Sequence, residues 1–494
     1  MKYIYMILLL GGCTLMVSCE KILDKEPLGL PDVSSYYDIK STYLETLTSV
    51  YDQVHAGYVT AHRPGVVGDA MSDDVNLGPQ KNVAITSHYN YSFDAQSVTP
   101  AWQGLYQLIS LANVFLEKVS DNQDNRSRLA RGEAFFLRGF AYHELARWYG
   151  RAQIFTTNPT SSKGYFTERA SEEESWNQAL SDLRAAAERL PARYPDPNDL
   201  GRATLGAAWS YIAKSHLYLR NWDSVNVYVD KVKALGIYNL TSDYATNFNM
   251  TGENNVESIF EVQQGRSGFN VFQNNGENNN YLQQYGPRGL VGKVPGFTSN
   301  MQGGYEPTTN LFNCYAKSDK RIGALFILPG NVLTFDGVTI NVPADLVTFK
   351  KAWSSTGIAP RKWIIDPSNF INLDAWNTPL NWKLFRYAEL LLMDAEAANE
   401  LNNNIRALES LNKVRGRAGI SILTTIPAAI KDSIRMEYRR ELAFEGHRFF
   451  QLVRWGTIPQ AMLDRGFIKG KHELMPIPQS ERDLNPKLDQ NPNW

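Results

Sequence analysis

The chain has 494 residues, of which 43% are hydrophobic and 20% are charged, with 50 basic and 51 acidic side chains. A chain of this length and composition can bury a large core, in one large domain or a few ordinary ones, and is not expected to be disordered. Its formal net charge of −1 gives no electrostatic attraction to a polyanion, so we do not expect nucleic acid as a partner.

The first 18 residues have the layout of an export signal, with a basic residue, a short apolar run and small residues before Cys19. The run is shorter than the roughly 20 apolar residues that a membrane span requires. Cleavage after Met16-Val17-Ser18, a loose lipobox, would place the Cys19 thiol at the new N-terminus, where bacterial lipoproteins are acylated. We therefore predict a signal peptide over 1–18, lipidation of Cys19 and an acylated tether over 19–35 that holds the chain to a membrane.

An ordinary secreted protein is the alternative interpretation of this N-terminus. It leaves Cys19 unexplained, because Cys13 would be removed with the signal and only Cys314 would remain to pair with it. The mixed charges that follow Cys19 are also compatible with the surface-export tags of such lipoproteins.

Four helix pairs follow along the chain. Three have the spacing of the 34-residue tetratricopeptide pattern, and the first is recognised from the apolar stripes of its two helices. The pairs are centred on residues 36–56 and 101–120, 135–142 and 179–191, 209–216 and 225–232, and 391–398 and 407–414. A loop over 151–170 interrupts the second pair, Thr99 and Pro100 suit the start of a helix, and a last helix is expected over Lys431 to Trp455. Because no hairpin covers its own apolar face, the fold class predicted is an all-α stack of about four hairpins.

Long segments without helical periodicity separate these hairpins, roughly over 57–100 and 240–380. They are rich in Gly, Asn, Pro and aromatic residues, and only short runs such as 258–263 resemble strands. Connections this long are expected to form a packed, functional region, which we interpret as the binding face. The predicted division is an N-terminal helical region over 36–250, a loop-rich binding insertion over 251–380 and a C-terminal helical region over 381–494.

Catalytic patterns are missing from the sequence: it has no G-x-S-x-G, phosphate-binding glycine loop, paired C-x-x-C or H-E-x-x-H motif. Glu441 and Glu445 lie one turn apart with Arg448 at helical contact spacing, and we predict structural ion pairing there. A glycosidase would need two carboxylates in different environments flanking a sugar bond. His143, His216 and His447 are predicted to be structural, so we expect no enzyme, no cofactor and no metal.

Three stretches resemble the signatures of the SusD/RagB family. They are 386–393 through 411–419, 440–449 with 452–455, and 476–479 through 484–492. The lipobox, Ser72-Asp73-Asp74 and Ala112-Asn113 extend the resemblance to essentially the whole chain, while Gln451 departs from it where an aspartate is usual. The resemblance implies a tetratricopeptide-based lipoprotein at the cell surface, anchored in the outer membrane, that binds glycan and delivers it to a TonB-dependent, SusC-like transporter. RagB-like relatives deliver peptides, so a peptide-binding adaptor is the alternative.

A sugar ring offers an apolar C–H face and a rim of hydroxyls, so its binder needs exposed aromatic planes beside amide, carboxylate or guanidinium groups. The long insertions supply both. The candidate ligand contacts are Asp73, Asp74, Asn76, Tyr89, Tyr91, Tyr281, Tyr285, Arg288, Tyr305, Trp353, Trp363 and Trp376. The tryptophans on helical stripes, Trp102, Trp148, Trp209 and Trp455, are predicted to lie in the core. A calcium ion at Asp73 and Asp74 is left open, since the spacing is not that of a cation-binding loop.

Overall fold

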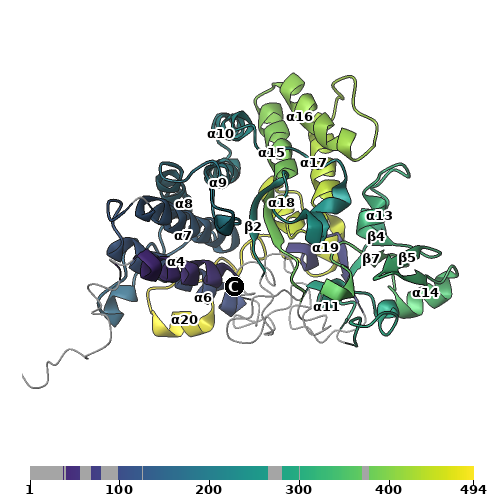
Figure 1. The fold of residues 1–494 in the computed structure, drawn as a ribbon, viewed down its shortest axis with the longest axis horizontal. Coiled ribbons are helices and arrows are strands. Elements are labelled where there is room, and N and C mark those ends of the chain that lie inside the picture. Colours follow the sequence, from purple (N-terminus) through teal and green to yellow (C-terminus); the bar gives the residue numbers. More distant parts are fainter. Residues whose placement is uncertain are drawn as a thin grey trace, which may run out of the picture.

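The fold is taken from a computed structural model, and the structure describes residues 37, 40–55, 68–78, 98–124, 126–264, 281–299, 301–369 and 378–494. Four long helix pairs form its frame (Figure 1). They are α4 (Lys40–His55) with α6 (Val98–Lys118), α7 (Ser127–Tyr149) with α8 (Glu172–Ala187), α9 (Leu205–Tyr218) with α10 (Trp222–Ala234), and α15 (Tyr387–Glu400) with α16 (Asn404–Arg417). The predicted all-α class and its four hairpins are confirmed.

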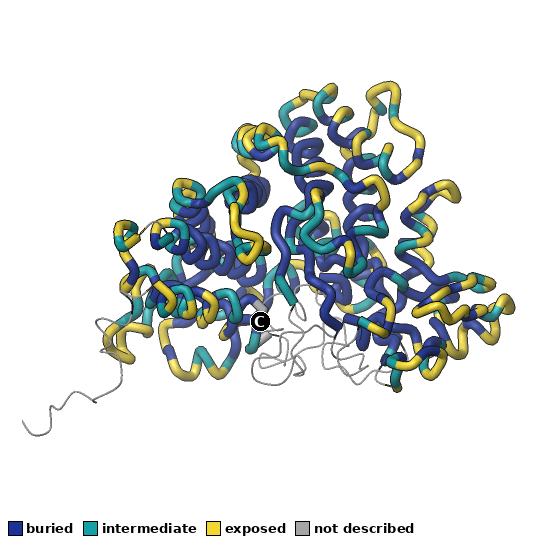
Figure 2. The backbone as a smooth tube through the Cα atoms, viewed as in Figure 1, coloured by how far each residue is buried: buried dark blue, intermediate teal, exposed yellow. Residues whose placement is uncertain are grey.

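The hairpins stack in one curved row, because α6 packs on α7, α8 on α9 and α10 on α15. The fourth hairpin therefore follows the third in space, although about 150 residues separate them in sequence. Helices α7, α9 and α15 are buried on nearly all sides, whereas α10 and α16 bury one stripe and expose the other side (Figure 2). Trp102 and Trp148 lie in the resulting core, and Trp209 and Trp455 are half-buried against it, as their helical stripes predicted.

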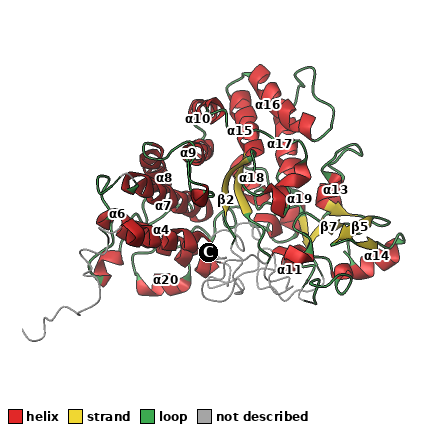
Figure 3. Ribbon diagram, in the orientation of Figure 1, coloured by secondary structure: helices red, strands yellow, loops and turns green. Residues whose placement is uncertain are grey.

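Shorter elements fill the connections (Figure 3). The helices are α11 (Tyr281–Tyr285), α12 (Thr309–Phe312), α13 (Ile322–Leu325), α14 (Leu346–Ala352), α17 (Ile430–Glu441), α18 (Arg448–Trp455), α19 (Gln460–Asp464) and α20 (Gln479–Leu484). The 3₁₀ turns are η1 (Ser162–Tyr165), η2 (Pro197–Asp199), η3 (Tyr244–Phe248), η4 (Met250–Gly252), η5 (Arg288–Leu290) and η6 (Pro367–Asn369).

The strands are β1 (Val75–Leu77), β2 (Ser258–Val262), β3 (Tyr305–Pro307), β4 (Phe326–Ile327), β5 (Val332–Phe335), β6 (Val338–Asn341), β7 (Ala359–Pro360) and β8 (Trp382–Arg386). They form four two-stranded antiparallel sheets, β1–β3, β2–β8, β4–β7 and β5–β6. The strand expected at 258–263 is β2, which pairs with the strand that leads into α15. Strands β5 and β6 join through Asp336 and Gly337, both with positive φ, as a tight hairpin turn requires.

Helix boundaries follow local signals where polar caps are present. At the start of α8, Ser171 and Glu174 form a capping box, and Thr204 caps α9 through the Ala207 amide. The helix expected to start after Thr99 and Pro100 begins at Val98 instead, which places both residues in its first turn. A shift of this size is within the usual spread of helix ends.

The single helix expected over 431–455 is wrong, because the chain breaks between α17 and α18. Phe444 and Gly446 have positive φ values of 63° and 76° there. The break is set by a tertiary contact: a Cβ on Gly68 would lie 2.0 Å from the Gly446 carbonyl oxygen, and the Gly446 amide donates to Asp69 Oδ1 at 3.0 Å. Helical periodicity carries no information about a distant segment that crosses at this point. Among the described residues, no helix combines the length and apolar character that a membrane crossing requires.

Candidate functional site

The segment 68–78 lies between the two halves of the chain and is fixed by arginines from the C-terminal helices. The Asp73 carboxylate accepts two bonds from Arg448, at 2.8 and 3.1 Å, and Asp74 accepts from Arg439 Nε at 2.6 Å. Asn76 Oδ1 accepts from Arg465 at 2.6 Å. Burial alone would raise the pKa of Asp73, but Arg448 and Arg439 outweigh it and lower that pKa.

These three predicted ligand contacts therefore serve as cross-links between β1 and the C-terminal region. Both aspartates are buried, at 6% and 1% exposure, with arginine as the partner. No group of three or more histidine, cysteine, aspartate or glutamate side chains in the described ranges could hold a metal ion.

Three aromatic rings meet where α11 approaches β8. Tyr281 stacks on Trp382 at 4.2 Å between centroids with 7° between planes, and Trp363 lies 4.5 Å from Trp382 and 5.0 Å from Tyr281. The Trp363 Nε1 donates to the Phe444 carbonyl at 3.0 Å, so the break between α17 and α18 also positions this ring. Trp382 was not among the predicted contacts; it begins β8, immediately before the signature helix.

The remaining predicted aromatic contacts of the described chain are also buried. Tyr285 donates to Asp69 Oδ2 at 2.6 Å and packs 5.3 Å from Tyr305, while Trp353 stacks on Phe349. The exposed fractions of Tyr281, Tyr285, Tyr305, Trp353 and Trp363 are all 5% or less. Their ring faces pack against protein, which differs from the exposed platforms that we expected.

Arg288 is exposed at the start of η5, whereas Tyr89, Tyr91 and Trp376 lie outside the described residues. The structure thus brings Tyr281 and Trp363 together with Trp382, and Tyr285 together with Tyr305. Whether each of these residues contacts the ligand stays a prediction.

Described residues of the predicted binding insertions form two hydrogen-bonded groups. Gly78, before 79–97, donates to Gly304 at 2.8 Å, and the Gly304 amide donates to Gln284 at 2.8 Å, three residues into α11. Gln264, before 265–280, donates to Asn381 Oδ1 at 2.7 Å, close to the end of 370–377. Strand pairs β1–β3 and β2–β8 hold these points in place. These residues lie close to the aromatic cluster, because Gln284 is in the same helix as Tyr281 and Asn381 precedes Trp382.

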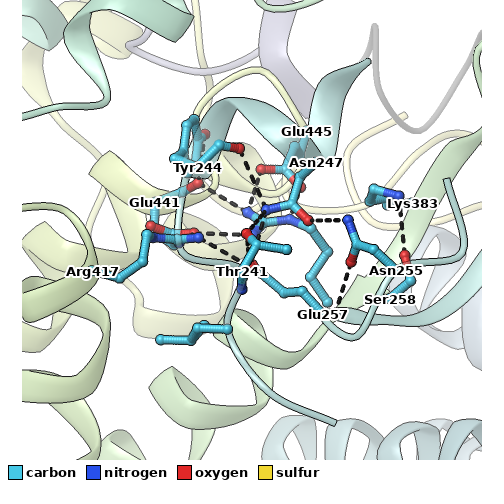
Figure 4. A network of polar contacts seen from close by, with 12 residues as sticks. Thr241, Tyr244, Asn247, Asn255, Glu257, Ser258, Lys383, Arg417, Glu441 and Glu445 are labelled. Carbon is cyan, nitrogen blue, oxygen red and sulfur yellow. Dashed lines mark hydrogen bonds and ion pairs between the residues drawn. The ribbon is translucent and has the colours of Figure 1, made fainter. Parts of the chain in front are cut away.

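A buried ion network joins the strands and helices next to the aromatic cluster (Figure 4). Arg386 forms ion pairs with Glu257, Glu441 and Glu445, and Arg417 forms ion pairs with Glu257 and Glu441. All these side chains are 4% exposed or less, so the network is desolvated. It ties β2, β8, α16 and α17 into one rigid base.

Glu441 and Glu445 are thus structural, as predicted, although Arg448 bonds to Asp73 and does not pair with them. Burial would raise the pKa of Glu441, but Arg417, Arg386 and Arg321 lower it to about 2. The pKa of Glu445 is also lowered, by Arg386 and Lys362 against the effect of burial. A general acid needs the opposite shift. This carboxylate pair is therefore built for ion pairing.

The three histidines that were expected in helices have structural partners, although His447 lies in the break before α18. His143 Nδ1 lies 2.9 Å from Ser215 Oγ, His216 stacks on Tyr228, and His447 Nδ1 lies 3.7 Å from Glu389. Burial lowers the pKa of His447 to about 3, so its ring is neutral.

Comparison with protein families assigns the fold. Residues 220–466 match the family described as the SusD family, and residues 23–219 match the family described as "Starch-binding associating with outer membrane". The chain belongs to the SusD family. The SusD-like protein P25 of Formosa agariphila is 25% identical, with 95% of each chain covered, and the SusD-like protein P38 of the same organism is 24% identical, with 98% of this chain and 97% of that protein covered.

Solved structures of SusD-like proteins share this architecture. A SusD-like protein described as laminarin-binding superposes with a TM-score of 0.78 at 25% identity, covering 92% of this chain and 99% of that chain. Surface glycan-binding protein A from Bacteroides thetaiotaomicron, solved in complex with laminarihexaose, gives a TM-score of 0.75 at 19% identity with the same coverage. The SusD fold therefore extends over nearly the whole chain.

Proposed function

We propose that this SusD-family protein captures an oligosaccharide at the outer membrane and delivers it to a TonB-dependent, SusC-like transporter. One structural observation carries the proposal: described residues of the predicted binding insertions, among them Gln264 and Gln284, lie near the Tyr281–Trp363–Trp382 cluster, on a base fixed by ion pairs. A rigid base suits ligand capture, because the groups that it positions lose little conformational entropy on binding. The glycan-binding relatives support carbohydrate as the ligand class.

The strength expected of such a site is modest. A sugar hydroxyl exchanges hydrogen bonds with water for bonds with protein, at a net gain of about 1 kcal/mol each. Stacking of the C–H face on an aromatic ring adds about 0.5–1.5 kcal/mol per ring. Modest affinity fits a protein that must release its cargo to a transporter.

The anchor belongs to the same proposal. Acylated Cys19 would hold the protein to the outer membrane, and residues 19–35 would give it reach as a tether on the cell surface. The description of the matching N-terminal family, which refers to association with the outer membrane, supports this placement.

A glycan array tests the ligand class. The full chain without its signal peptide is expected to bind at least one oligosaccharide family, with isothermal titration giving a dissociation constant in the micromolar range or weaker. A parallel peptide library is expected to give no comparable hit. Binding to peptides alone would replace the proposal with peptide uptake.

Purification from detergent-solubilised outer membrane tests the transporter. A tagged copy expressed in its native cell is expected to recover a TonB-dependent barrel. Recovery of the tagged protein in quantity with no barrel would contradict the delivery step while leaving glycan capture standing.

A further inference from the structure

The insertion between α7 and α8 forms one wall of a groove that none of the assigned roles uses. The groove has a volume of about 340 Å³ and lies between α6, residues 153–166 and α20. Helices α6 and α20 are on the left of Figure 1, whereas α11 is on the right, so the groove is separate from the aromatic cluster at α11. A hollow of this size is at the lower end of the range for small-ligand sites.

Aromatic rings line the groove in an unbroken series. Tyr106 lies 4.8 Å from the Trp102 ring and 6.3 Å from Phe155, and Phe155 lies 5.7 Å from Tyr165. Trp102 is buried, Tyr106 and Phe155 are half-buried, and Tyr165 is 42% exposed. Tyr165 therefore offers the accessible phenol plane that the buried rings of the binding insertion lack.

The rings are held in place before any ligand arrives. The Gln153 amide donates to Tyr106 Oη at 2.8 Å, and Gln153 Nε2 donates to the Tyr165 carbonyl at 3.0 Å. The Phe155 amide donates to Tyr142 Oη at 2.7 Å, and the Phe155 carbonyl accepts from Asn113 at 3.0 Å. Three of these bonds fix the insertion to α6 or α7 and the fourth closes the insertion on itself, so binding would cost little conformational entropy.

Polar groups complete the lining and restrict the ligand. Gln103 Nε2 donates to Glu481 Oε1 at 2.8 Å, and Ser110 and Asn158 add a hydroxyl and an amide. Glu481 is the only charged residue among those that line the groove, and no lysine or arginine lines it. A carboxylated or sulfated ligand would meet a like charge without a compensating cation, whereas a neutral polyhydroxylated ring meets apolar faces and hydrogen-bonding partners.

We propose that this groove is a second saccharide subsite, which takes two or so rings of a neutral oligosaccharide with Tyr165 as its stacking platform. The proposal rests on the glycan-binding function proposed above and adds a site on the helical half of the molecule. Two separated subsites would let one protein hold a long polysaccharide at two points, which strengthens retention through effective concentration.

Titration calorimetry with laminarihexaose, maltohexaose and xylohexaose tests the subsite on the full chain without its signal peptide. Tyr165→Ala is expected to weaken one of two binding events by about three- to tenfold, and Tyr165→Phe to preserve it, because the ring face is retained. Tyr228→Ala on α10, outside the groove, is the matched control and is expected to leave both events unchanged.

The outcomes separate the two proposals. Wild-type binding that Tyr165→Ala leaves untouched, with its melting temperature unchanged, would overturn the groove and leave the proposed function intact. Failure of the wild-type chain to bind any glycan on the array would overturn both. Equal affinity of the groove for alkyl detergents and for the hexasaccharides would overturn the saccharide assignment in favour of a general apolar groove.

Discussion

Arg386 shows what single residues contribute to this molecule. Its guanidinium contacts three buried carboxylates and the Glu441 carbonyl, and it is 1% exposed. Because those carboxylates are desolvated, their negative charges are stabilised in the fold by the cations that face them. The residue identity is part of the family signature, but its partners come from β2, α17 and the following break, which no local pattern connects.

We predict that Arg386→Met lowers the free energy of unfolding by about 3–5 kcal/mol, because it leaves carboxylates buried without their cation. Urea denaturation followed by circular dichroism measures the change. Arg435→Met is the control, because Arg435 makes no ion pair in the described part of the chain. Its guanidinium lies 5.0 Å from the Trp455 ring, so the variant is expected to lose about 1 kcal/mol or less. A similar small effect for both variants would contradict the structural role of the network.

Acid is predicted to destabilise the protein in two steps. The folded pKa of His447 is about 3 and its ordinary value is 6.5, so between these values only the unfolded chain binds that proton. Glu441 titrates at about 2 in the fold and about 4.5 when unfolded, which extends the loss to lower pH. Stability therefore falls as pH falls below about 6.5, by at most about 1.4 kcal/mol per pH unit for each group.

Melting temperatures recorded from pH 7 to pH 3 measure this dependence. His447→Gln is expected to reduce the slope between pH 6.5 and 4.5, since one titrating ring is removed. His143, His216 and His472, whose pKa values are also lowered by burial, keep the remainder of the slope. A profile for that variant parallel to the wild type would show that other groups cause the acid sensitivity.

A substitution of Trp363 distinguishes a role in the core from a direct contact with the ligand. Its ring lies against Tyr281 and Trp382 and its Nε1 is hydrogen-bonded, so Trp363→Ala is predicted to cost about 3–5 kcal/mol of stability. Leu346→Ala, at a 49% exposed position, is the control. Loss of glycan binding in a Trp363→Ala variant with an unchanged melting temperature would instead assign the ring to ligand contact.

At the scale of elements, periodicity predicted the hairpins well and failed at the end of α17. The hairpins bury one stripe of each helix against a sequence neighbour, so the apolar spacing records the packing. The break at Leu442 to His447 depends on Gly68, more than 370 residues earlier. The helical spacing of Ile434, Tyr438, Leu442 and Phe449 continues through the break, and only the crossing of segment 68–78 shows why the helix ends.

Gly68 provides a test of this crossing. A Cβ at this position would overlap the Gly446 carbonyl, so Gly68→Ala is predicted to destabilise the protein by about 1–3 kcal/mol. Gly323→Ala is the matched control, because no heavy atom lies within 4 Å of its added Cβ and helix α13 favours alanine. Thermal unfolding of both variants measures the difference. Equal melting temperatures would show that the close approach of Gly68 to Gly446 does not cause the break.

At the scale of the whole molecule, ion pairs and strands join regions that are far apart in sequence. Asp73 and Arg448 are separated by 375 residues, and Gln103 and Glu481 by 378. These cross-links unite the helical stack and the insertions in one body. An external tether at the N-terminus can then position the whole protein at the membrane.

Lipid attachment is predicted to depend on Cys19. Cys19→Ser should abolish incorporation of labelled fatty acid and shift the protein from the membrane fraction to the soluble fraction. Cys13→Ser, within the predicted signal peptide, is the control and should leave both unchanged. Membrane retention of the Cys19→Ser protein would require another anchor.

The helical hairpins and the family resemblance could be predicted from the amino-acid sequence, because they depend on local spacing and on residue types. The ion pairing of Glu441 and Glu445 was also predicted. Its partners Arg386 and Arg417 come from distant segments, however, and Arg448 bonds to Asp73 instead. Only the tertiary structure decided which rings are covered. Tyr281 and Trp363 were predicted as open platforms, yet they pack against Trp382, and Asp73 and Asp74 bond to arginines of distant helices. Exposure depends on which segments meet in space. Tyr165, in a short turn without a helical pattern, became the exposed ring because its insertion folds back on α6.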